Sequence, residues 1–172
     1  LFYLQYRKQN KKDIFLQSLK EPKKKYSWED VYIKTIKLSE EISRYIKKGD
    51  RCLLISENRP EWMIADLSIM LSGGITVPAY TTYTERDYEY IIDDSTPAIV
   101  IISDKSLYEK VKNIIPQKKF IKKIILFEYI KNLDEEFNLN VNNIFKNNIN
   151  DEKIFFNLKI LRSDIACIIY TS

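Results

Sequence analysis

The chain has 172 residues, of which 45% are hydrophobic and 30% charged, and it carries a formal net charge of +4. This is the size of one domain and the composition of an ordinary globular protein, which excludes a chain that is disordered throughout. Histidine is absent, so these residues exclude a Ser-His-Asp or Cys-His catalytic site and any histidine-ligated metal site.

The charged residues and the cysteines narrow the class of protein further. The lysines are spread in short runs beside predicted turns, whereas a nucleic-acid-binding protein gathers such charge on one face with stacking aromatics. We therefore expect a solvated basic surface and no nucleic acid partner. Cys52 and Cys167 lie inside apolar runs and fit neither a disulfide framework nor a metal site, so both are expected to be buried free thiols.

No segment of the sequence has the properties of a targeting or membrane-spanning element. No signal peptide is visible, and no apolar stretch approaches the roughly 20 residues that span a bilayer. These observations predict a cytoplasmic protein, and a peripheral contact with a membrane is left open.

The first predicted helix begins at a capping box. Ser27 and Asp30 stand at the N-cap and N3 positions, and apolar residues then recur in steps of three and four to about Lys47. Gly49 is expected just past the end of this helix. The apolar run 51–56 follows as a buried strand.

The next segment predicts a second helix and a second strand. Pro60 stands where a first-turn proline belongs, and the residues 60–71 are apolar on most sides, so this helix should be largely buried. A glycine pair stops it, and a strand is expected over 75–80. A capping box at Thr84 and Asp87 then opens a helix to about residue 94.

The second half of the chain continues the alternation at first. The expected elements are a strand at 98–103, a helix at 104–115 and a strand at 123–127. Strand–helix alternation with short connections predicts an α/β fold, a mainly parallel sheet layered with helices. Asn, Lys, Asp and Glu dominate 129–161, which is expected to be a polar surface insertion with one poor helix. A fifth buried strand is predicted at 164–170.

Generic nucleotide-binding fingerprints are excluded. The chain contains only three glycines, too few for a Gly-x-Gly-x-x-Gly loop, and their spacing does not fit a Gly-x-x-x-x-Gly-Lys-Ser/Thr loop. The predicted sheet is therefore not a standard dinucleotide-binding or P-loop domain on its own residues.

Five motifs follow one another in a specific order and at specific spacings. They are KGDR at 48–51, SENRPEW at 56–62, GGITVPAY at 73–80, IIDDS at 91–95 and DIACIIYTS at 164–172. Together they resemble the N-terminal part of the AMP-forming acyl-CoA synthetases, in the adenylate-forming superfamily that also contains luciferases and peptide-synthetase adenylation domains. The resemblance covers about residues 26–172, and SENRPEW is similar to the long-chain fatty acyl branch.

The resemblance implies a fold and a function. Residues 1–172 would be a partial AMP-binding domain, the first subdomain of the synthetase N-domain, truncated at the start of the ATP phosphate loop. The parent protein would activate a long-chain fatty acid with ATP and Mg²⁺ and transfer it to CoA. Tyr170, Thr171 and Ser172 would begin the loop, with the Thr171 hydroxyl near the phosphates and Mg²⁺. No catalytic residue would lie in the fragment, which alone is expected to be inactive.

Two alternatives remain open at this point. In the first, the parent protein is another adenylate-forming enzyme, such as a peptide-synthetase adenylation domain or an aryl-CoA ligase. The other alternative is a non-enzymatic α/β scaffold module.

Several conspicuous side chains are expected to have structural roles. Glu61 and Trp62, early in a helix, should cap and pack, and Arg59 should be solvated or paired. Asp93 and Asp94, at a helix C-terminus, suggest turn chemistry. Core packing is also favoured over a ligand contact for a group of tyrosines, namely Tyr80, Tyr83, Tyr88 and Tyr90.

Overall fold

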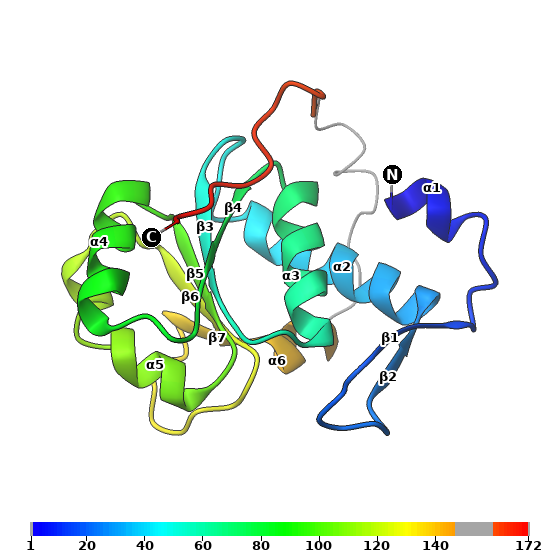
Figure 1. Ribbon diagram of the computed structural model, residues 1–172, viewed down its shortest axis with the longest axis horizontal. Helices are drawn as coiled ribbons and strands as arrows, with labels where there is room; N and C mark the ends of the chain where they lie inside the picture. Colours follow the sequence, from blue (N-terminus) through cyan, green and yellow to red (C-terminus); the bar gives the residue numbers. More distant parts are fainter. Residues whose placement is uncertain (1, 147–159, 172) are drawn as a thin grey trace.

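The computed structural model describes residues 2–146 and 160–171, and it has an α/β architecture built on one parallel sheet (Figure 1). The sheet has five strands in the order β4-β3-β5-β6-β7. They are β3 (Arg51–Ile55), β4 (Ile75–Ala79), β5 (Ile99–Ile102), β6 (Lys123–Leu126) and β7 (Asn138–Asn140). The predicted parallel α/β fold is therefore confirmed, together with the four strands β3 to β6 that the apolar runs predicted.

Helices cover both faces of this sheet (Figure 1). One face carries α2 (Trp28–Ser43), α3 (Pro60–Leu71) and α6 (Val141–Lys146), and the other carries α4 (Glu85–Ser95) and α5 (Lys105–Val111). Side chains of β3 alternate between the two cores: Cys52 and Leu54 belong to the first, Leu53 and Ile55 to the second. A strand buried on both faces needs apolar residues at every position, which explains the continuous apolar runs.

Two capping boxes start α2 and α4 at the predicted residues. Ser27 Oγ accepts from the Asp30 N–H at 3.1 Å, and Thr84 Oγ1 accepts from the Asp87 N–H at 3.3 Å. Each aspartate carboxylate in turn accepts from the N-cap N–H at 2.9 Å. Two otherwise unpaired N–H groups are thus satisfied at each helix start.

Helix ends differ from the sequence-based expectation. α2 ends at Ser43 and not near Lys47, and Gly49 makes the turn into β3 with a φ of +89°. α5 ends at Val111, and a short 3-10 turn, Ile115–Gln117, completes the segment that was predicted as one helix.

Residues 2–27 form elements that the sequence pattern did not predict. They are the helix α1 (Phe2–Tyr6) and an antiparallel hairpin of β1 (Ile14–Gln17) and β2 (Lys25–Ser27). Aromatic stacking fastens them to α2: Phe15 lies on Trp28 with ring centroids 3.9 Å apart, and Tyr6 lies on Tyr32 at 4.2 Å.

The range 129–161 differs from the expected surface insertion. Its residues 138–140 form β7, which pairs in parallel with β6, and the short helix after it packs Val141 and Ile144 into the core beside α2. The polar composition obscured this strand because β7 is short and lies at the edge of the sheet, with half-buried side chains. Residues 147–159 of the predicted insertion lie outside the described residues.

The predicted fifth strand at 164–170 is wrong. The segment makes one isolated parallel bridge, between Cys167 and Thr76 of β4. The Thr76 N–H donates to the carbonyl of Ala166 at 3.0 Å, and the Ile168 N–H donates to the carbonyl of Thr76 at 2.9 Å.

Burial in this segment also differs from expectation. Ile165 and Ile169 are 62% and 61% exposed, and Cys167 is exposed, although Cys52 is fully buried as predicted. The segment follows the free edge of β4 and makes a single bridge to it, so these three side chains are not enclosed as they would be in an interior strand. Among the described residues, no helix is long and apolar enough to cross a membrane.

Candidate functional site

A cleft of about 540 Å³ opens where β3 and β4 end. Ser56 follows β3 and Ala79 ends β4, and both line the cleft together with Trp62, Tyr80 and Ile169. In parallel α/β sheets, ligands bind outside the carboxyl ends of the strands. This edge of the sheet is therefore the place where a ligand site is expected, and residues 169–171 run beside it.

Three side chains of the α4 region hold Tyr170. Its phenol donates a 2.5 Å hydrogen bond to Asp94 Oδ2, and its carbonyl accepts from the Tyr83 hydroxyl at 3.4 Å. Its ring meets the Tyr90 ring edge-on, with centroids 6.2 Å apart. Burial is the main cause that raises the pKa of the Tyr170 phenol to about 12, and the hydrogen bond to Asp94 is the second cause. The hydroxyl therefore stays a donor at neutral pH.

The other two residues of the predicted phosphate-loop start are less constrained. Thr171 is exposed, so its hydroxyl is accessible to a ligand. Ser172 lies outside the described residues. The structure thus places Tyr170 and Thr171 together next to α4, and their nucleotide role stays a prediction.

The paired aspartates at the end of α4 do more than terminate a helix. Asp93 pairs with Lys118 at 2.6 Å, and Asp94 accepts the hydrogen bond of Tyr170. Both residues belong to the IIDDS motif. The contact between Asp94 and Tyr170 could not be predicted from the sequence, because the two residues are 76 positions apart.

The tyrosine cluster is only partly in the core. Tyr88 is fully buried and donates to the Tyr80 carbonyl at 2.8 Å, and Tyr83 is half-buried. Tyr80 and Tyr90 are both 64% exposed, so the expectation of core packing is wrong for these two. The Tyr90 ring contacts the Tyr170 ring, and Tyr80 lines the open cleft at the ends of β3 and β4.

Arg59 and Glu61 have the structural roles that were expected. Glu61 is 5% exposed and accepts hydrogen bonds from Tyr26 at 2.7 Å and from Arg59 Nε at 3.0 Å. Burial alone raises the pKa of Glu61, but hydrogen bonds from Lys24, Tyr26 and Arg59 lower it to about 2. Arg59 also reaches Glu128 at 3.3 Å, so its charge is neutralised inside the fold.

A metal ion at this site would be bound mainly by substrate phosphates and water molecules, with few protein ligands. No group of three or more His, Cys, Asp or Glu side chains in residues 2–146 and 160–171 is arranged to bind one. Magnesium usually takes one or two protein oxygens together with substrate phosphates and waters. The exposed hydroxyl of Thr171 fits the role of one such protein oxygen.

A sequence model of the family described as AMP-binding enzyme matches residues 4–172, nearly the whole chain. The chain belongs to the AMP-binding enzyme family. The site described above therefore lies in a domain of an adenylate-forming ligase family, which confirms the resemblance inferred from the five motifs.

Individual relatives match shorter segments. A long-chain-fatty-acid–CoA ligase of Mycobacterium tuberculosis is 35% identical over 63 residues, which are 37% of this chain and 10% of that protein. Long chain acyl-CoA synthetase 3 of Arabidopsis thaliana is 29% identical over 112 residues, 63% of this chain and 17% of that protein. The chain thus matches only a small part of the length of these relatives.

Solved structures of the family share the fold. A coronafacic acid ligase of Pectobacterium brasiliense superposes with a TM-score of 0.82 at 19% identity and covers 98% of this chain and 32% of that chain. An anthranilate–CoA ligase in complex with anthranoyl-AMP gives a TM-score of 0.64 at 18% identity, over 72% of this chain and 23% of that chain. The predicted fold class is confirmed by both.

Proposed function

We propose that the protein to which these residues belong activates a long-chain fatty acid with ATP and transfers it to CoA. The observation that carries the proposal is the family match over residues 4–172. Fatty acid as the substrate class is supported by the curated relatives, several of which are long-chain acyl-CoA ligases.

The proposed reaction has two steps. A carboxylate oxygen of the acid attacks the α-phosphorus of ATP, which forms acyl-AMP and releases pyrophosphate. The sulfur of CoA then attacks the acyl carbon, loses its proton, and displaces AMP. Negative charge on phosphate oxygens grows in the first step, so donors that are fixed in place before the reaction stabilise its transition state.

Thr171 and Ser172 are proposed to supply the first hydroxyls of the phosphate site. Hydroxyl and backbone N–H groups that converge on one point form an anion-binding nest, and Mg²⁺ held there would neutralise phosphate charge. Thr171 is exposed and its neighbour Tyr170 is held on two sides. Both features support this role.

Residues 1–172 are proposed to be a partial AMP-binding domain. The matched segments span 10% and 17% of two curated relatives, and the chain covers 32% of a solved ligase. On this proposal the groups that bind the acid and CoA lie elsewhere in the whole protein, and the 172-residue chain alone is inactive. A cytoplasmic location, with peripheral membrane contact left open, stays a prediction.

Pyrophosphate release by the full-length protein tests the substrate class. It should be fastest with a long-chain fatty acid such as hexadecanoate and slower with benzoate or an amino acid. A preference for benzoate would favour an aryl-CoA ligase, and a preference for an amino acid would favour a peptide-synthetase adenylation domain. No release with any of these acids would support the scaffold alternative.

A matched pair of variants tests the role of Thr171. Thr171→Ala removes the hydroxyl and should lower kcat for pyrophosphate release by about 100-fold, the usual loss when one transition-state donor is removed. Thr171→Ser keeps a hydroxyl and should retain most of the rate. Equal rates for Thr171→Ala and the wild-type protein would refute the assignment.

A further inference from the structure

We propose that Asp94 is a positioning residue for the phosphate loop: its carboxylate anchors the phenol of Tyr170 and thereby orients Thr171. This inference rests on the proposed function of Thr171. The IIDDS motif then does more than end a helix, because its Asp94 accepts a 2.5 Å hydrogen bond from a residue 76 positions away.

Tyr170 is held both at its phenol hydroxyl and at its backbone carbonyl. The Asp94 carboxylate holds its phenol, and the Tyr83 hydroxyl donates to its carbonyl at 3.4 Å. That carbonyl belongs to the peptide group that joins Tyr170 to Thr171, so a contact with it constrains the peptide plane from which Thr171 extends. The edge-on contact with Tyr90 limits rotation of the Tyr170 ring.

Backbone pairing does not provide this constraint. In the described residues 160–171, the ladder hydrogen bonds to β4 are those of Ala166 and Ile168 with Thr76. Tyr170 lies two residues beyond the last of them. The direction of the chain at Thr171 is therefore set by side-chain contacts with the α4 region.

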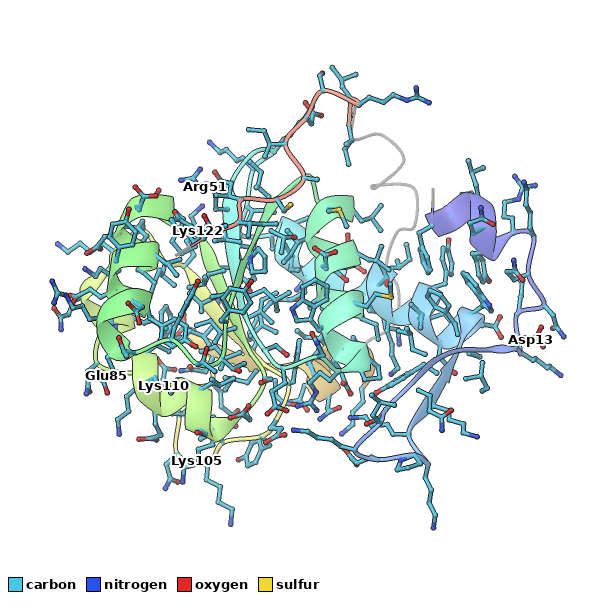
Figure 2. The ribbon with its side chains drawn as sticks, viewed as in Figure 1. Asp13, Arg51, Glu85, Lys105, Lys110 and Lys122 are labelled. Carbon is cyan, nitrogen blue, oxygen red and sulfur yellow. The ribbon has the colours of Figure 1, made fainter. Side chains whose placement is uncertain are left out.

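Asp94 is itself held in place by β3. The Arg51 guanidinium, seen beside the end of α4 in Figure 2, donates to the carbonyl of Ser95 at 2.7 Å and to that of Thr96 at 3.1 Å. Thr96 adopts a left-handed conformation with a φ of +43°, which ends the helix sharply. These hydrogen bonds attach the end of α4 to the central sheet and so fix the position of the Asp94 backbone.

Tyr83 is held in place by α5. Lys110 of α5, labelled in Figure 2, donates from Nζ to the carbonyls of Thr81 and Tyr83 at 2.9 and 3.0 Å. The Tyr88 hydroxyl donates to the carbonyl at the start of the same loop. Both partners of Tyr170 thus stand on elements that are anchored independently, which is what a positioning contact requires.

Loss of this anchor should affect the reaction more than the stability of the fold. Tyr170 is half-buried at an open edge, and its hydrogen bond with Asp94 is exposed, so Tyr170→Phe leaves no cavity in either core. Misplacement of a reacting group by about 1 Å costs on the order of 100-fold in rate. The effect should therefore appear in kcat for adenylate formation and not in KM for the fatty acid.

The experiment compares variants of the full-length protein by pyrophosphate release. Tyr170→Phe and Asp94→Ala should each lower kcat by about tenfold or more, and the combined variant should be no worse than either alone, since both remove one interaction. Asp94→Asn keeps an oxygen acceptor and should retain most of the rate. Asp93→Asn, which weakens the neighbouring pair with Lys118, is the control and should be unaffected.

Hydrogen–deuterium exchange of the peptide 164–171 gives a readout that does not depend on activity. The amide of Ile168, which is hydrogen-bonded to Thr76 of β4, should exchange several-fold faster in Tyr170→Phe and Asp94→Ala than in the wild-type protein or Asp93→Asn. Unchanged exchange in both variants, or additive losses of kcat in the combined variant, would overturn the anchoring role. If the wild-type protein released no pyrophosphate with any acid, the proposed function would fail, and faster exchange in the two variants would still support the anchor.

Discussion

The Tyr26 hydroxyl donates a 2.7 Å hydrogen bond to the Glu61 carboxylate and so joins the N-terminal hairpin to the first turn of α3. Arg59 and Lys24 bind the same carboxylate from two further directions. Because Glu61 is 5% exposed, its charge would be costly without these partners. The ionised form of Glu61 therefore contributes to the stability of the fold.

Acid should therefore destabilise the chain through Glu61. Its pKa lies at about 2 in the folded state against an ordinary value of 4.5, so the unfolded chain takes up the proton first as pH falls. The stabilisation is complete above pH 4.5 and is lost as pH falls toward 2. Urea unfolding of the 172-residue chain at a series of pH values should show this decrease. Glu61→Gln should have a flatter pH dependence over this range, whereas Glu89→Gln, at an exposed position, should keep the wild-type slope.

Trp62→Ala tests how deeply α3 is packed. The sequence pattern predicts a largely buried helix, for which a Trp→Ala substitution costs about 3–5 kcal/mol. Trp62 is half-buried beside the cleft, so the expected cost is about 2 kcal/mol. Met63→Ala on the same helix, 38% exposed, should cost less than about 1 kcal/mol. Equal costs for the two variants in denaturant unfolding would contradict the observed orientation of α3.

Two glycines should respond differently to alanine. A Cβ at Gly74 would lie 2.9 Å from Ile46 Cδ1 and 3.0 Å from Ile69 Cγ2, inside a packed core, so Gly74→Ala should destabilise by about 1–3 kcal/mol. A Cβ at Gly49 meets nothing within 4 Å, but its φ is +89°, so Gly49→Ala should cost about 1 kcal/mol from backbone strain alone. Thermal unfolding would separate the two, and a neutral Gly74→Ala would show that Ile46 moves aside freely.

Thiol labelling should distinguish the two cysteines in the 172-residue chain. Cys52 is fully buried, and burial raises the pKa of its thiol to about 12, whereas Cys167 is exposed. Since the thiolate is the reactive form, Ellman's reagent should modify one thiol quickly under native conditions and a second only on unfolding. Cys167→Ser should remove the fast phase. A fast phase that persists in Cys167→Ser would mean that β3 is accessible to the reagent.

The amino-acid pattern was sufficient for the central architecture. The runs 52–55 and 98–102 are apolar at every position because these strands are buried on both faces, and the capping residues Ser27 and Thr84 fix the starts of two helices through contacts three residues away. Both signals are local in the sequence, so they could be recognised without the fold.

The local sequence pattern does not show whether a segment at the edge of the sheet forms a strand. Residues 138–140 alternate Asn-Leu-Asn and form an edge strand, although the composition around them suggested a loop. Residues 164–170 are apolar like an interior strand, yet they make one bridge to β4 and stay largely exposed. Which edge of the sheet a segment joins depends on the whole sheet and cannot be read from the segment.

The sequence by itself determined the α/β class, the parallel strands of the sheet centre, the two capped helices and the family that the motifs resemble. Only the tertiary structure revealed that Glu61 is paired with Tyr26 and that Asp94 holds Tyr170, across 35 and 76 residues. Periodicity and capping act over a few residues, within one helix or strand. Contacts between side chains on different elements depend on how the chain folds back, and this is decided by the packing of both cores together.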